Sequence, residues 1–314
     1  MNHARMGRRS LLTRAAIVAA LPALAVGADQ PRIAESRRRA LADFEDPIQR
    51  LATVVRMRGA LDPGLVITFL EGVYYGVMAA QIRPLYGISA ALFRQYRPRS
   101  DGGFDCANYE LVFITDLDTG GLLPEFRNPY SGRVVKPPQA RFGPSRLAIL
   151  PSLEVQRVAR PVAAPTPTPQ EVSAARSGGT QGAAHFHRFR PPRVVGDDVW
   201  IVEESSIQLP PPVNIPLNEL LTYHARLSDL ADPSLTHVPT EVQFSPVIGW
   251  RPWQGMEGFD GPASHVMGVC AGRVVRSFEE LPAAYRRWTA EYHPDVQADV
   301  LGLLAPAWAT QPAA

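Results

Sequence analysis

The feature that most constrains this chain is a series of short segments, beginning at Leu65, in which apolar and polar side chains alternate. The first of them, residues 66–77, is rich in β-branched and aromatic side chains, and that composition favours a β-strand. The other segments of this kind are residues 92–98, 109–116, 122–127, 133–135, 185–189, 199–202, 220–227 and 242–247. The pattern predicts a mainly β fold.

Tight turns separate several of these segments. Asp118-Thr119-Gly120-Gly121 is typical of a turn because glycine adopts positive φ at no steric cost, and Asn128-Pro129-Tyr130-Ser131-Gly132 is a second turn. Short strands joined by tight turns form an antiparallel meander rather than a parallel sheet. We expect the meander to close into a barrel, lipocalin-like in outline, because about eight strands can enclose one small ligand.

A helix is predicted on each side of the β-rich region. Apolar residues recur at helical spacing over residues 33–58, with an interruption near Pro47. Near the other end, Ser277 is a candidate N-cap and Glu280 stands at the capping-box position. That helix is expected to stop before His293-Pro294.

The first 28 residues have the pattern of an export signal. The adjacent arginines Arg8 and Arg9 precede an apolar run over residues 15–26, which is too short to span a bilayer. We predict a twin-arginine leader that engages the twin-arginine translocase and is cleaved after Ala25 or Ala28. The mature protein would then be periplasmic or otherwise exported. An ordinary secretory signal and an uncleaved anchor are the alternatives.

Charge and cysteine content limit the classes of partner. The formal charge of +2 becomes −2 when the four leader arginines are removed, so we expect no nucleic-acid binding. No other stretch is long and apolar enough to predict a stable membrane span. Cys106 and Cys270 lack partners at metal-binding spacing, and the sequence leaves open whether they form a disulfide.

The predicted organisation is a leader at 1–28, a helical segment at 29–62 and a single β-rich domain at 63–300, followed by a tail at 301–314. A tract at 155–183 interrupts the β pattern with proline, alanine and threonine. Such a tract cannot bury enough apolar surface to offset its ordering entropy, so we expect a disordered insertion within the domain.

Four motifs in this order resemble an uncharacterised bacterial family, domain of unknown function 1838. They are Asp116-x-Asp118-Thr119-Gly120, Asn128-Pro129-Tyr130-Ser131-Gly132, Val238-Pro239-Thr240, and Trp250-Arg251-Pro252-Trp253 with Met256. The resemblance covers about residues 60–300, and relative to the family the tract at 155–183 looks like an insertion. It implies an exported protein of similar fold. It implies no reaction, because the family has no established activity.

Candidate ligand-binding residues centre on an aromatic motif. Trp250, Trp253 and Met256 lie within seven residues and could form one wall of an apolar pocket, or an aromatic plug that closes the barrel. Arg127 is a candidate counter-charge, and Tyr75 is a further candidate ligand contact.

Candidate acid–base residues are Glu110, His187 and His265. Alternation places Glu110 on the same strand face as Val112 and Ile114, which suggests an inward carboxyl group. His185 and His187 share a strand face but lack a third ligand at metal spacing, so we predict no metal site. No nucleophile elbow, dinucleotide motif or P-loop is present, and the sequence identifies no cofactor.

Three functions fit these patterns. The first is an exported barrel that binds an apolar or amphipathic small molecule in its interior. The second is an enzyme that uses an interior Glu/His acid–base pair. The third is a non-catalytic envelope protein whose tract at 155–183 contacts a partner. The sequence leaves open whether the protein is an enzyme.

Overall fold

The structure is a computed structural model that describes residues 43–158, 184–209, 215–259 and 264–309, with positions 35, 38 and 41. The predicted leader and most of the predicted insertion lie outside these residues. The first four residues of that insertion are described, however. They form a strand, Val155–Val158, so the excursion from the sheet begins later than predicted.

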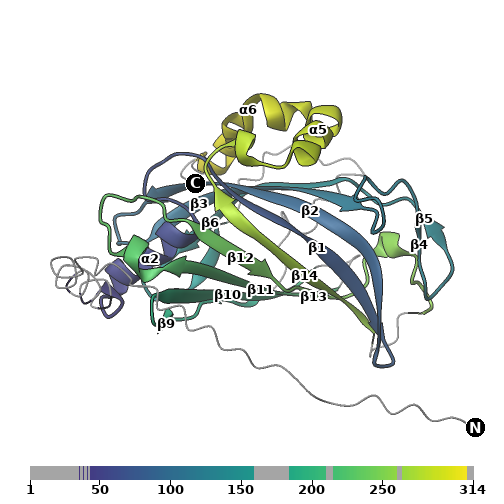
Figure 1. Ribbon diagram of the computed structural model, residues 1–314, viewed down its shortest axis with the longest axis horizontal. Helices are drawn as coiled ribbons and strands as arrows, with labels where there is room; N and C mark the ends of the chain where they lie inside the picture. The colour runs from purple at the N-terminus through teal and green to yellow at the C-terminus, as the bar shows by residue number, and fades with distance from the viewer. Residues whose placement is uncertain are drawn as a thin grey trace, which may run out of the picture.

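Twelve strands of the described ranges form one antiparallel sheet. Within the sheet, hydrogen-bonded strands follow the order β7-β6-β3-β2-β1-β14-β12-β11-β10-β8. In addition, β13 pairs with β11 and β14, and β9 pairs with β10 (Figure 1). The bounds are β1 Val66–Met78, β2 Gln81–Pro98, β3 Phe104–Thr115, β6 Ala140–Ile149, β7 Val155–Val158, β8 Ala184–Phe189, β9 Arg193–Val195, β10 Asp198–Gln208, β11 Pro216–Arg226, β12 Thr240–Phe244, β13 Val247–Ile248 and β14 His265–Val275. The mainly β prediction is confirmed.

The two ends of this strand order lie against each other. Glu154, next to β7, forms a single antiparallel bridge with Arg188 of β8. The amide of Phe189 also donates a hydrogen bond of 2.8 Å to the carbonyl of Leu153. The backbone groups that an isolated edge strand would expose are thereby partly satisfied.

Part of each of strands β1, β2 and β3 is buried on both faces. Their even-numbered residues, such as Leu70, Ile88 and Val112, pack in the interior enclosed by the sheet. Their odd-numbered residues, such as Phe69 and Phe113, pack in a second core on the outer face. Double burial explains the nearly continuous apolar sequence of these strands.

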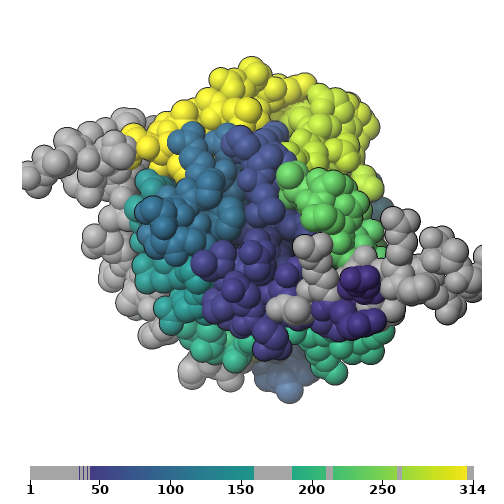
Figure 2. Space-filling view, turned by 90° about the vertical axis from the view of Figure 1, so that its left-hand side faces the viewer, coloured from purple at the N-terminus to yellow at the C-terminus, as the bar shows by residue number. Residues whose placement is uncertain are grey.

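Helix α2, Pro47–Arg58, covers one end of the sheet. It begins at the predicted interruption, where the Asp46 carboxylate accepts hydrogen bonds from the amides of Ile48 and Gln49. Figure 2 views this end and places the purple segment that contains α2 in its middle. Because Leu51 and Val55 point into the interior core, α2 buries its apolar face against the sheet.

The C-terminal helices cover the outer face of β1, β2 and β3. Helix α5, Ala283–Tyr292, and helix α6, Pro294–Leu304, lie above these strands in Figure 1. The Tyr285 hydroxyl donates a hydrogen bond of 2.9 Å to the Leu111 carbonyl. Leu304 is fully buried in the outer core, so the predicted tail at 301–314 begins within a packed helix.

The β1–β2 hairpin contains two strained alanines. Ala79 and Ala80 form its two-residue turn with φ of 49° and 62°, a conformation that disfavours a Cβ atom. We expect Ala80→Gly to raise the free energy of unfolding by about 1 kcal/mol, measured by urea denaturation. Ala305→Gly is the control, since Ala305 has φ of −53°. Equal destabilisation by both substitutions would contradict the strain.

Candidate functional site

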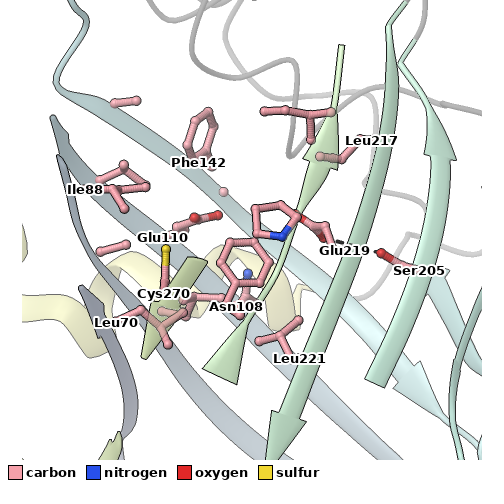
Figure 3. Close-up of a pocket in the computed structure, with 18 of the residues that line it drawn as sticks. Leu70, Ile88, Asn108, Glu110, Phe142, Ser205, Leu217, Glu219, Leu221 and Cys270 are labelled. Carbon is pink, nitrogen blue, oxygen red and sulfur yellow. Dashed lines mark hydrogen bonds between the residues drawn. The ribbon is translucent and has the colours of Figure 1, made fainter. Parts of the chain in front are cut away.

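A cavity of about 360 Å³ lies in the interior of the sheet, in the size range of small-molecule sites. Strands from both halves of the sheet contribute to its lining, as Figure 3 illustrates for part of it. Much of the lining is apolar, from side chains that include Leu70, Ile88, Val112, Ile114, Phe142, Leu147, Leu217, Leu221 and Phe244. The cavity therefore offers an apolar surface to a bound molecule.

Charged side chains occupy the same cavity. Arg58, Arg94, Arg157 and Arg251 contribute guanidinium groups to its lining, and Glu110, Glu203 and Glu219 contribute carboxyl groups. Charges in a low-dielectric interior cost free energy unless they are paired or used. The pairing of each one therefore indicates what the cavity can bind.

One carboxylate is fully paired. Glu203 receives hydrogen bonds of 2.8 and 2.9 Å from the Arg58 guanidinium and one of 2.8 Å from the Tyr223 hydroxyl. The side chains of Arg58 and Glu203 are only 3% and 4% exposed. Burial opposes ionisation of Glu203, but Arg58 and then His187 hold its pKa well below the usual range. This pair stays ionised and joins α2 to β10.

His187 is held by the same carboxylate. Its Nε2 atom lies 2.9 Å from the Glu203 carboxylate, and its side chain is 17% exposed where it lines the cavity. A carboxylate that orients an imidazole ring is the arrangement that general bases use. His187 is therefore positioned to exchange a proton with a molecule in the cavity.

Two further carboxyl groups face the cavity without a salt bridge in the described part of the chain. Glu110 on β3 and Glu219 on β11 extend into it from opposite sides (Figure 3). Burial, and then the nearby Glu219 carboxyl group, raise the pKa of Glu110 to about 7 against the opposing effect of Arg94 and Arg251. Burial also raises the pKa of Glu219, whose carboxyl accepts a hydrogen bond from Ser205 at 3.4 Å. Both groups therefore resist ionisation.

The structure brings two of the three predicted acid–base residues together. Glu110 lines the cavity with Val112 and Ile114, as the alternation predicted, and His187 lines it as well. His265 begins β14 and pairs with Val77 of β1, and it is not part of the lining. The role predicted for these residues stays a prediction.

The aromatic motif contributes part of the cavity lining. Trp253 lines it and packs against Tyr86 and Phe126, with ring centroids 5.4 and 6.2 Å away. Trp250 packs edge-on against Tyr130, and Met256 is buried in the interior core, so neither belongs to the lining. Of the three predicted contacts in the motif, only the Trp253 indole faces the cavity.

The other two predicted ligand contacts lie away from the cavity. Arg127 is exposed on the short strand β4, Phe126–Arg127, and donates a hydrogen bond to the Gly132 carbonyl at 3.1 Å. Tyr75 lies on the opposite face of β1 from Tyr74, which does line the cavity. Because side chains alternate between the two faces of a strand, Tyr74 lies on the same face of β1 as Leu70. The tyrosine that contacts the cavity is therefore one position before the predicted one.

Sequence reasoning missed Glu203, Glu219, Arg58 and Arg94. A signal existed for Glu203, because it continues the apolar phase of Val199 and Ile201 on β10. No such signal existed for Arg58, which occupies the last position of a helix. Its partner is 145 residues away in the sequence.

The described ranges contain no group of three His, Cys, Asp or Glu side chains arranged to hold a metal ion. Cys106 and Cys270 are free, buried thiols, and burial raises the pKa of Cys270 to about 12. Within the same ranges, no helix is both long and apolar enough to cross a membrane.

No protein-family model matches this sequence, and a comparison with curated proteins finds no match. The resemblance to domain of unknown function 1838 stays a prediction.

Proposed function

We propose that this protein binds an amphipathic small molecule inside its sheet. The observation that carries the proposal is the coexistence of apolar walls and charged groups in one cavity of about 360 Å³. Small-molecule sites typically combine an apolar lining with a few polar groups that fix the orientation of the ligand. The cavity contains both parts.

The proposal includes the architecture and the location predicted from the sequence. The contact between β7 and β8 supports a sheet that closes as a barrel, with α2 at one end. Export through a twin-arginine leader is proposed from the Arg8-Arg9 pair, the apolar run over residues 15–26 and the cleavage site that follows it.

Leu221 and Leu220 provide a matched test of binding. Leu221 lines the cavity and is 8% exposed, whereas Leu220 faces outward on the same strand and is 45% exposed. We expect Leu221→Trp to fill the cavity and weaken binding of the neutral dye N-phenyl-naphthylamine by about tenfold or more. Leu220→Trp should bind the dye like the unmodified protein.

Dye fluorescence gives both affinities, and thermal unfolding establishes that each variant is folded. Equal dye affinity in the two folded variants would contradict binding inside the sheet.

An acid–base enzyme is the second candidate. The observation that favours it is the His187 ring, which Glu203 orients at 2.9 Å in the wall of the cavity. The discriminating measurement is mass spectrometry of a molecule that co-purifies with the protein. A binding protein returns that molecule unchanged after incubation, whereas an enzyme converts it.

A further inference from the structure

Arg94 is a buried cation that has no carboxylate partner among the described residues. Its side chain lines the cavity, and the residue is only 2% exposed. The guanidinium donates hydrogen bonds to the neutral groups of Thr68, at 2.6 Å, and Asn108, at 3.2 Å. In the described chain no carboxylate lies within salt-bridge distance of Arg94. A buried guanidinium left in this state favours an added anion.

Arg251 is a second available cation in the lining. It precedes the short helix Pro252–Gln254, which contains the lining residue Trp253. Its guanidinium makes no salt bridge to a described residue. The positive charges of Arg94 and Arg251 both lower the pKa of Glu110, so both act on the region of the cavity around that carboxyl group.

The charge balance of the lining is positive. Arg58 and Glu203 neutralise each other at 2.8 Å. Arg94 and Arg251 then stand against Glu110 and Glu219. Burial raises the pKa of both carboxyl groups and so reduces their negative charge near neutral pH. A cationic ligand is repelled by this excess, and an anionic one is attracted.

We infer that the ligand is an amphipathic anion whose carboxylate or phosphate head group is held by Arg94 and Arg251, with its apolar body against the apolar part of the lining. This inference rests on the proposed function and names the ligand class. Arginine suits the role because its planar guanidinium matches carboxylate and phosphate oxygens in two parallel hydrogen bonds.

Four probes with the same alkyl chain test the inference: decanoate, decyl phosphate, decanol and decylamine. Isothermal titration of the full-length protein should give at least about tenfold tighter binding for one of the two anions than for decanol, and the weakest binding for decylamine. The stronger of the two anions identifies the head group. Equal affinity for decanol and both anions would overturn the inference and leave the proposed function intact. Binding of none of the four would overturn both.

Substitutions locate the head group. Arg251→Gln removes a guanidinium without breaking a described salt bridge, so we expect a folded protein that binds the preferred anion about tenfold more weakly and decanol unchanged. Arg94→Gln should act in the same direction if thermal unfolding finds it folded.

Arg127→Gln is the control, because Arg127 is exposed and lies off the lining, and its anion affinity should not change. An Arg251→Gln variant that binds anion and decanol as tightly as the unmodified protein would contradict the assignment.

Discussion

Replacing Arg58 with methionine is expected to lower the free energy of unfolding by about 3–5 kcal/mol. The substitution keeps most of the apolar volume but leaves Glu203 without its principal counter-charge in a site where both side chains are at most 4% exposed. Tyr223 and His187 would be the remaining partners of the carboxylate. Urea denaturation measures the loss.

Two comparisons separate this effect from a general loss of packing. Arg226→Met is the surface control, because its bond to Asp198 is 2.7 Å long but its side chain is 56% exposed, and it should cost at most about 1 kcal/mol. Adding Glu203→Gln to Arg58→Met should restore part of the lost stability, because no unpaired buried charge remains. Equal losses for Arg58→Met and Arg226→Met would contradict the network.

Long apolar runs rich in β-branched and aromatic residues allowed some strands to be predicted from the sequence. Strands β1 and β3 carry long apolar runs, and both were expected. Strand β14, which contains Gly268 and Gly272, was not expected. Glycine is required at position 272 by a contact with the neighbouring strand, because a Cβ atom there would clash with the Phe69 carbonyl oxygen on β1. Only the folded sheet reveals such a close approach.

In the candidate site, too, the local sequence predicts some residues and only the tertiary structure reveals others. Glu110 could be predicted because its phase is set by neighbours two and four positions away on one strand. The ion pair of Glu203 with Arg58 could not, because strand register and the position of α2 bring the two together. The prediction of Tyr75 as a ligand contact was wrong by one residue, because adjacent side chains of a strand point to opposite faces and Tyr74 is the one that lines the cavity.

Glu110 is expected to make stability depend on pH. Burial raises its pKa to about 7 from the ordinary value of 4.5, so the folded state binds its proton more tightly than the unfolded state does. The stabilisation from that proton is complete below about pH 4.5 and is lost as the pH rises through about 7. The difference between the two pKa values corresponds to about 3 kcal/mol.

Glu110→Gln removes this dependence, because an amide keeps the shape and hydrogen-bonding capacity of the neutral carboxyl group. Relative to the unmodified protein, the variant should gain about 3 kcal/mol between about pH 4 and pH 8, measured as the difference between two urea-denaturation series. Glu241→Gln is the control, since that side chain is 82% exposed and the difference should stay near zero. Parallel curves for Glu110→Gln and the unmodified protein would mean that Glu110 is solvated and ionised as in water. Glu110 would then add a full negative charge to the cavity, which would weaken the case for an anionic ligand.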